Sequence, residues 1–500
     1  MGASPLPSLF INHKIFGLIF PCYSLYRKHQ SIRLICSSSL SCDIGSDPIQ
    51  SQELCNGRWE SFRKKKVVMR IGYVGTDYRG LQLQRDNGPS TVEGELETAI
   101  FKAGGIIDSN YGNIDKVGWA RSSRTDKGVH SLATMISLKM EIPENAWNRD
   151  PNGINMANTI NAHLPNNMKV FGVLPSQRSF DARRECIARM YSYLLPAEII
   201  GITNQCGPGE IERHLLEFNN ILKTFEGDHP FHNYTARSKY RRRHCGGSNF
   251  SKGTISSKET SDAEDEQSDE EEESGRATTD NEQSDDKGLD YSEMPDNNFE
   301  LSNDVAAPRV RAKWVHEPDE KDLISGSHFR KIFSFTCGKL ETSNEMPFLE
   351  ICVCGESFML HQIRKMVAAA IAVKRALLPH DVIDLSLTKF SRMVLPIAPS
   401  EVLILKGNKY SLRNLPCGSK PEVFRLIESK EINEAIENFY SSVLLPQVSS
   451  AFLDPSRPPW MDWVEKLDKY ASIPDAELDE VRKAWRSWKD NRPVYTYLRQ

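Results

Sequence analysis

The chain has 500 residues, of which 39% are hydrophobic and 26% are charged, and its formal net charge at pH 7 is −4. This length is enough for two or three domains, and the eleven cysteines form no Cys-x-x-Cys pair, so neither a zinc site nor a disulfide framework is indicated. Residues 251–300 carry 18 acidic and four basic side chains, a net of −14, so the other 450 residues carry +10. A body this basic suits a polyanionic partner.

The first 42 residues contain no Asp or Glu, are rich in Ser and include four Lys or Arg side chains. This composition is typical of an organelle transit peptide, so we expect residues 1–60 to be a disordered transit peptide. The Ser-rich character favours a chloroplast address, with mitochondrion or nucleus as alternatives, and a tail without any address also stays open. Polar residues and a proline interrupt the apolar stretch 9–26, which argues against a membrane span.

Residues 63–178 are predicted to form the first half of the main domain. Alternating apolar residues predict a half-buried strand over 67–74, a second strand over 134–140 and a third over 168–174. Before the second strand, Ser90 and Glu93 have the spacing of a capping box, and the helix that they start is expected to stop at Gly104.

A short polar loop just before residues 134–140 holds one carboxylate, Asp126, between Arg124 and Gly128. Residues two apart in an extended segment share a face, and a guanidinium nearby keeps a carboxylate ionised. Gly128 suits a sharp turn, and we expect His130 to hold the loop from the far side. An ionised, oriented Asp can act as a nucleophile. Taken alone, the same string also fits a surface salt bridge in a turn.

Residues 179–410 are predicted to form the second half, with a disordered acidic insertion at 250–308. In the strand expected at 187–195, Arg189, Tyr191 and Tyr193 alternate onto one face, which we expect to be exposed. Further elements are expected: a helix over 210–225, strands over 329–336 and 348–354, and a helix from Ser357 toward residue 377. Residues 411–500 have a helical, Trp-rich pattern and are predicted to be a C-terminal helical extension. The whole pattern predicts an α+β architecture.

Six short strings resemble, in the right order, the tRNA pseudouridine synthase A (TruA) family, and two of them resemble its eukaryotic branch. The family converts uridine to its carbon-linked isomer in structured RNA. The strings begin at Gly75, Arg124, Phe180, Phe231, Ser357 and Leu395. Two positions depart from the family pattern, since Leu81 stands where many bacterial members have Trp and Val402 where a Gly often follows the closing Ala-Pro.

The resemblance implies a pseudouridine synthase fold, in which two ferredoxin-like halves share a mixed, mainly antiparallel sheet with an RNA-binding catalytic cleft. It implies that Asp126 is the nucleophile, that Tyr191 stacks on the flipped base and that Arg364 pairs with the carboxylate. The target base must leave its stack to be reached. The remaining residues that the resemblance places against the substrate are Arg124, Arg183, Arg189, His361 and Lys365.

The expected partner is tRNA, with other structured RNA also open, and no membrane is expected to take part. Basic runs at 63–66, 183–184 and 237–243 are candidates for contacts with phosphates, although 241–243 equally fits a solvated flank of the insertion. No Gly-rich phosphate loop, metal cluster or cofactor motif occurs, so no cofactor or metal is expected. The sequence does not decide between a monomer and a homodimer, and it does not identify the uridine.

Two other functions remain open on the sequence. A non-catalytic RNA-binding protein could keep the same fold, although it has little use for a buried carboxylate facing a phosphate polymer. A hydrolase could use Asp126 on a sugar or a phosphate, but the chain offers no second carboxylate at recognisable spacing and no metal ligands.

Overall fold

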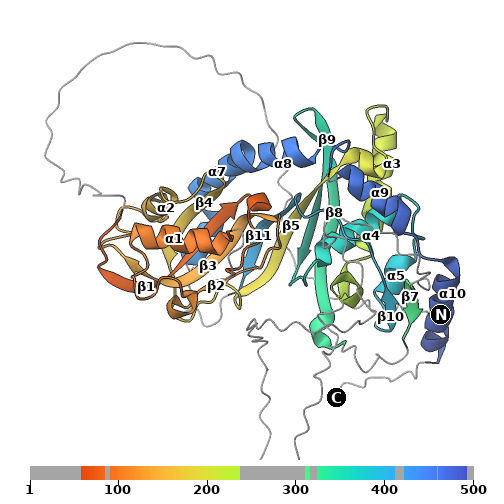
Figure 1. The fold of residues 1–500 in the computed structure, drawn as a ribbon, viewed down its shortest axis with the longest axis horizontal. Coiled ribbons are helices and arrows are strands. Elements are labelled where there is room, and N and C mark those ends of the chain that lie inside the picture. The colour runs from red at the N-terminus through yellow and green to blue at the C-terminus, as the bar shows by residue number, and fades with distance from the viewer. Residues whose placement is uncertain are drawn as a thin grey trace, which may run out of the picture. The chain divides into compact units, whose positions relative to one another are not determined.

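One mixed sheet of nine strands runs through both predicted halves of the domain (Figure 1). The computed structural model describes residues 58–84, 90–236, 310–315, 324–411, 422–458 and 460–491, all within the unit formed by residues 54–500. The predicted insertion at 250–308 and all but the last three residues of the predicted transit peptide lie outside the described residues.

The strand order is β4-β1-β3-β11-β5-β9-β8-β6, with β2 paired to β3 off this path, and β7 pairs with β10 in a small second sheet. Every pairing described is antiparallel except that of β3 with β11, where the strands of the two halves meet. The strands are β1 (Arg63–Tyr73), β2 (Ala120–Arg121), β3 (His130–Ile142), β4 (Met168–Pro175), β5 (Cys186–Pro196), β6 (Gly227–Pro230), β7 (Ala312–Trp314), β8 (Phe329–Ser343), β9 (Met346–Gly355), β10 (Ser391–Met393) and β11 (Leu403–Tyr410).

Ten α-helices, a π-helical turn and several short 3-10 helices are described alongside these strands. The α-helices are α1 (Val92–Ala103), α2 (Ile154–Asn161), α3 (Pro208–Lys223), α4 (Gln362–Lys374), α5 (Val382–Ser386), α6 (Arg425–Glu428), α7 (Lys430–Phe439), α8 (Leu445–Phe452), α9 (Trp460–Tyr470) and α10 (Asp475–Asp490). The π-helical turn is η9 (Tyr440–Leu444), and the 3-10 helices are η2 (Gly75–Asp77), η3 (Ile114–Val117), η4 (Ala197–Ile200), η5 (His232–Tyr234), η7 (Gly326–His328) and η8 (Glu422–Phe424). The strands and helices expected from the sequence are therefore present, and the α+β prediction is confirmed.

Both faces of β1 are buried, so the prediction of a half-buried strand is wrong. Met69 and Ile71 pack into a core shared with α1 and α2, as their alternation predicted. On the opposite face, Val68 lies in a second core with residues of α6 and α7. Arg70 is also buried there and donates hydrogen bonds to the carbonyls of Leu132 (3.1 Å) and Leu426 (2.9 Å). A charged residue in a strand is usually exposed to solvent. Here α6, which is distant in sequence, supplies one of the two acceptors that allow Arg70 to be buried.

The two ends of α1 differ in how well the sequence predicted them. Its N-cap is Thr91, whose hydroxyl accepts from the Gly94 amide at 3.3 Å, and not Ser90 as the capping-box pattern predicted. Its C-cap is Gly104 in the left-handed conformation (φ 96°), as expected. Glu93 is therefore free to make contacts outside its own helix.

Helix α4 packs against the second half of the sheet and is buried along most of its length. Four alanines between residues 368 and 372 keep its side chains short, which allows close approach to its neighbours. The sequence predicted a helix that starts at Ser357, but the helix begins at Gln362. The preceding residue, His361, has a φ of 64°, and this left-handed conformation prevents the helix from extending backwards.

The C-terminal region is helical, as predicted, and it contacts both halves of the sheet (Figure 1). Helices α6 and α7 lie against β4, whereas α10 lies against β7 and α5. Trp460 is fully buried against Tyr193, and the indole of Trp463 donates to the Ile397 carbonyl at 2.5 Å. The tryptophans thus pack the extension onto the domain. None of the described helices is long and apolar enough to cross a membrane.

Candidate active site

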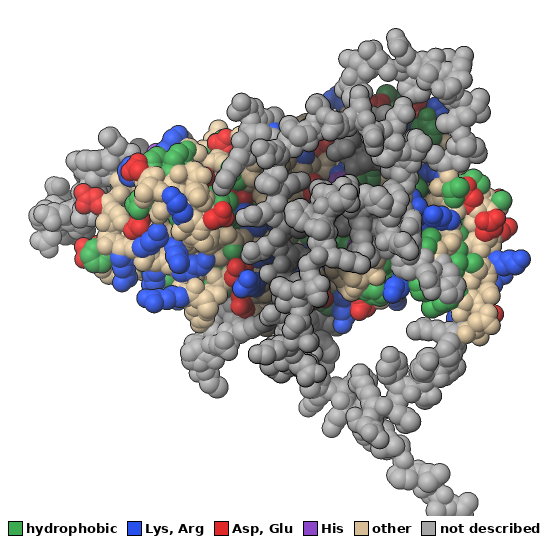
Figure 2. Space-filling model, turned by 60° about the horizontal axis from the view of Figure 1, so that its bottom comes forward, with side chains coloured by type: hydrophobic (Ala, Val, Ile, Leu, Met, Phe, Trp, Pro, Cys, Tyr) green, Lys and Arg blue, Asp and Glu red, His purple; other side chains and the backbone are tan. Residues whose placement is uncertain are grey.

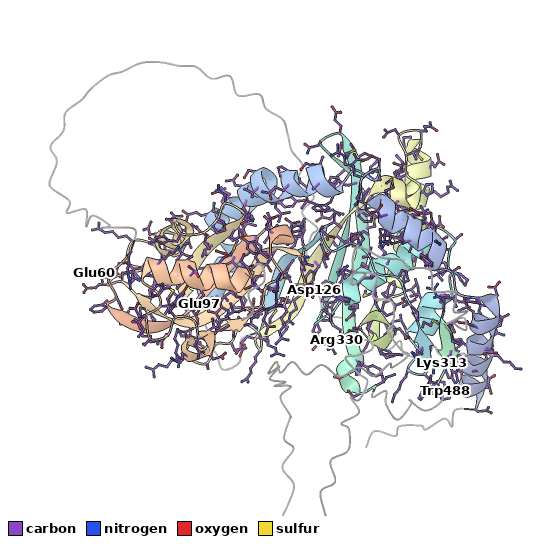
Figure 3. All side chains as sticks on the ribbon, viewed as in Figure 1. Glu60, Glu97, Asp126, Lys313, Arg330 and Trp488 are labelled. Carbon is purple, nitrogen blue, oxygen red and sulfur yellow. The ribbon has the colours of Figure 1, made fainter. Side chains whose placement is uncertain are left out.

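Asp126 lies on the loop between β2 and β3, near the region where the two halves of the sheet meet (Figure 3). Its side chain is partly exposed, whereas the neighbouring Thr125 is buried. The Thr125 hydroxyl lies 2.8 Å from the hydroxyl of Tyr73, which is fully buried in β1, and the Thr125 carbonyl accepts from the Leu81 amide at 3.1 Å. The carboxylate therefore projects from a loop in which the preceding residue, Thr125, is anchored to the sheet.

His130 ties this loop to two other segments. The Gly75 amide donates to Nδ1 of His130 at 2.9 Å, and Nε2 lies 2.7 Å from the Glu401 carbonyl. Burial lowers the pKa of His130, so the ring is neutral at pH 7. Because Nδ1 accepts, Nε2 must carry the proton and donate to Glu401. The expectation that His130 holds the loop is confirmed.

Two glycines permit the close packing around the loop. A Cβ added to Gly75 would lie 2.0 Å from the carbonyl oxygen of Val129, a distance that no side chain can adopt. Gly128 has a φ of 83°, and its Cβ would lie 2.9 Å from Oγ of Ser400. The loop that holds Asp126 is thus contacted by residues 75–81 on one side and by Ser400 and Glu401 on another.

Tyr191 is buried on β5, so the prediction that it lies on an exposed strand face is wrong. Its side chain is 7% exposed and meets Phe358 edge to face, with ring centroids 5.4 Å apart. Burial raises the pKa of Tyr191, the Ser123 hydroxyl opposes this rise, and Tyr73 and Asp126 add to it. The tyrosine therefore keeps its proton at neutral pH and lies within electrostatic range of Asp126.

Arg364 is buried in the first turn of α4 and contacts the loop 395–401. Its Nε donates to the Ala398 carbonyl at 2.7 Å, and the Ala398 amide donates back to the Arg364 carbonyl at 3.2 Å. Among the described residues, no ion pair joins Asp126 to Arg364 or to Arg124. Arg124 is exposed, and its pKa is lowered by burial of part of the side chain and by the like charges of Arg121 and Arg183.

The other four predicted substrate-binding residues fall into different settings. Arg189 donates to the carbonyls of Ser122 (3.1 and 2.8 Å), Cys186 (3.0 Å) and Glu356 (2.6 Å), so its guanidinium braces the start of the Asp126 loop. Lys365 is partly buried and donates to the Thr235 carbonyl at 3.2 Å. Arg183 is exposed, and His361 is partly exposed just before α4. Of these, only Arg183 presents an exposed charge.

The chain is similar to known proteins over most of its length. The family model of tRNA pseudouridine synthase matches residues 316–411, which contain Arg364 and the loop 395–401. The tRNA pseudouridine synthase 1 of Candida glabrata is 29% identical over 435 residues, which cover 84% of this chain and 74% of that protein. These matches make the chain similar to the tRNA pseudouridine synthase family.

Other relatives in the family differ in how much of their length is matched. The tRNA pseudouridine(27/28) synthase of Saccharomyces cerevisiae is 26% identical over 71% of this chain and 88% of its own length. The tRNA pseudouridine synthase 1 of Yarrowia lipolytica is 28% identical over 70% of this chain. The chain spans 65% of the length of that protein and 61% of the tRNA pseudouridine synthase 1 of Candida albicans.

Three residues that shape the site were missed from the sequence. The contact between the hydroxyls of Tyr73 and Thr125 anchors the Asp126 loop to β1, and Glu93 joins the segment before α1 to β2. Tyr73 stood on the apolar face of a predicted strand, and Glu93 was assigned to a helix cap. The available signal was the position of Glu93 three residues before Leu96 and seven before Ile100, which aligns it with apolar residues of the same helix.

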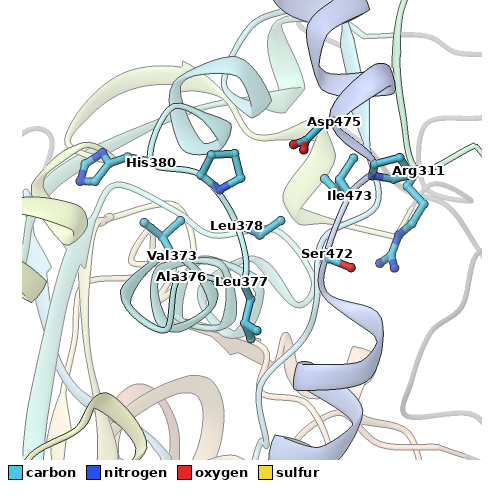
Figure 4. A pocket seen from close by; sticks show the side chains of 11 residues that line it. Arg311, Val373, Ala376, Leu377, Leu378, His380, Ser472, Ile473 and Asp475 are labelled. Atoms are coloured by element: carbon cyan, nitrogen blue, oxygen red, sulfur yellow. The ribbon is translucent and has the colours of Figure 1, made fainter.

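A cavity in the described part of the chain lies outside this site. A cavity of about 690 Å³ lies between the end of α4 and the segment that joins α9 to α10, and its polar lining includes Arg311, His380 and Asp475 (Figure 4). None of the predicted site residues lines it.

Within the described segments, no group of three or more His, Cys, Asp or Glu side chains is arranged to hold a metal ion.

Proposed function

We propose that this protein isomerises uridine to pseudouridine in tRNA, with Asp126 as the nucleophile. The observation that carries the proposal is the arrangement of a partly exposed carboxylate on a rigidly held loop, within electrostatic range of a buried, protonated tyrosine, in a chain similar to this family. The relatives are named as tRNA pseudouridine synthases, which supports tRNA as the substrate.

In the proposed reaction, Asp126 helps to break the bond between the sugar and N1 of uracil. The freed base rotates and reattaches through its carbon-5, which then loses its proton, while N1 gains one. Substrate and product contain the same atoms, so the reaction consumes no oxidant, reductant or phosphate donor. Tyr191 keeps its proton at neutral pH, which supports a role in which it stacks on the extruded base and holds or moves a proton.

A basic surface on the first half of the domain suits a polyanionic substrate. Lys66 of β1 lies directly opposite Lys139 of β3, and like charges in this position destabilise a bare sheet. Burial, together with Lys139, lowers the pKa of Lys66. Arg124 and Arg183 are exposed and lie within electrostatic range of each other. Figure 2 shows Lys and Arg side chains gathered over this half of the molecule, where phosphates of an RNA would stabilise them.

The test of this proposal is the incubation of the purified protein with transcribed tRNA. We expect uridine to convert to pseudouridine without a change in mass, detected after digestion to nucleosides. Binding of tRNA without conversion would favour the non-catalytic RNA-binding alternative. Release of free uracil or cleavage of the RNA would favour the hydrolase.

We also propose that residues 1–60 direct the protein to the chloroplast, on the basis of their Ser-rich composition and the absence of acidic residues before Asp43. A fusion of these residues to a fluorescent protein in plant cells is expected to accumulate in plastids. Accumulation in mitochondria would reassign the organelle, and a nuclear or cytosolic signal would overturn the address.

A further inference from the structure

Glu93 is a fully buried carboxylate that accepts three hydrogen bonds from two separate segments. The amide of Leu83 donates to Oε2 at 3.0 Å, the indole of Trp119 donates to Oε1 at 2.8 Å, and Nε of Arg121 donates to Oε1 at 2.5 Å. Burial of a carboxylate is costly unless donors satisfy it, and these three donors do so. The first turn of α1 thereby joins the loop before it to β2.

Both segments that Glu93 joins reach the loop of Asp126. On one side, the amide of Leu81, two residues before Leu83, donates to the carbonyl of Thr125 at 3.1 Å. On the other side, Arg121 is the last residue of β2 and is followed directly by the loop. A displacement at either contact would therefore be transmitted to the backbone that carries the nucleophile.

Helix capping does not explain this arrangement. Thr91 already caps α1 through the Gly94 amide, and a negative charge in the first turn stabilises a helix without being buried. Glu95 provides such a charge in the same turn, and its side chain is partly exposed. A fully buried carboxylate is needed only for the contacts that Glu93 makes outside the helix.

We propose that Glu93 is a positioning residue of the active site, a role that rests on the proposed function. Its carboxylate fixes residues 79–84 and β2 relative to each other, and through them it fixes the loop of Asp126. Glu93 does not touch the substrate. Its replacement is therefore expected to slow the chemical step and to leave the affinity for tRNA unchanged.

The test compares Glu93→Gln with the matched control Glu95→Gln. Glutamine keeps the shape and an acceptor oxygen but loses the charge that pairs with Arg121. We expect kcat of Glu93→Gln to fall roughly ten- to a hundredfold at temperatures where the variant is fully folded, with KM for tRNA within about twofold of the wild type. Glu95→Gln is expected to keep both values. An unchanged kcat, or a raised KM with an unchanged kcat, overturns the positioning role.

Amide hydrogen exchange separates this proposal from the proposed function. In Glu93→Gln we expect faster exchange in residues 79–84 and 122–129, with no such change in Glu95→Gln. Unchanged exchange in both segments overturns the proposal, whatever the activity. If exchange is faster in Glu93→Gln but the wild type converts no uridine, the structural link between Glu93 and the loop stands and the proposed function is rejected.

Discussion

Replacing Asp126 by asparagine is expected to reduce pseudouridine formation by at least about a thousandfold. Asparagine has nearly the same shape but cannot act as a carboxylate nucleophile. The side chain is partly exposed and takes part in no ion pair among the described residues, so its replacement removes no structural contact. We therefore expect the free energy of unfolding to change by less than about 0.5 kcal/mol. Single-turnover conversion of tRNA and thermal unfolding of the same preparation measure both quantities.

Asp115→Asn is the matched control for this substitution. Asp115 is exposed on the 3-10 helix η3, which precedes β2, and it lies outside the loop that carries Asp126. The control is expected to convert tRNA at the rate of the wild type. Affinity for tRNA should be unchanged in both variants, since the phosphates are expected to bind the basic side chains rather than the carboxylate. Conversion that persists in Asp126→Asn at more than about a tenth of the wild-type rate would exclude the nucleophile role.

The setting of Asp126 illustrates what sequence reasoning could reach. The loop, its glycine turn and the support from His130 follow from local spacing, and the structure contains all three. The resemblance to the family singled out Arg364, which lies buried in the first turn of α4. The acceptor of its guanidinium is the Ala398 carbonyl, 34 residues away, and local spacing carries no information on such a contact.

The errors in the fold have the same cause. The alternation of β1 predicted one buried face, and that face is correct. The other face is buried by α6 and α7, some 350 residues further along the chain, so no window of sequence around β1 could reveal it. Likewise, the helix pattern after Ser357 is continuous in sequence, but the left-handed backbone of His361 delays the start of α4 to Gln362. Tertiary contacts overrode local pattern in both places.

A second group of charges lies behind the site, on the sheet face opposite Tyr191. Lys406 of β11 pairs with Glu350 of β9, and Glu350 also accepts from the Ser192 hydroxyl at 2.5 Å. The Lys406 ammonium lies 4.9 Å from the centre of the Tyr440 ring, in the π-helical turn η9 of the extension. Burial opposes the charge of Lys406, but Glu350 and Tyr440 outweigh it and raise its pKa. The group joins three strands of the sheet, β5, β9 and β11, to the C-terminal extension.

Replacing Lys406 by methionine is expected to lower the free energy of unfolding by roughly 2–4 kcal/mol, since it leaves Glu350 partly buried without its cation. The value is below that for a fully buried pair because 28% and 22% of the two side chains are exposed. The control Lys430→Met breaks an exposed i,i+4 pair with Glu434 and should cost less than about 0.5 kcal/mol. Urea unfolding at pH 7 measures both.

The pH dependence of this loss has a defined sign. Burial tends to raise the pKa of Glu350, but Lys406 lowers it below its ordinary value of 4.5. The stability that the pair contributes is therefore present above that value and is lost as the pH falls through the lower pKa of the folded protein. We expect the difference in the free energy of unfolding between wild type and Lys406→Met to be constant between about pH 6 and 8, where carboxylates are ordinarily ionised. This difference should shrink below about pH 4. A difference that persists unchanged in acid would show that lost packing of the lysine stem, rather than the ion pair, accounts for the destabilisation.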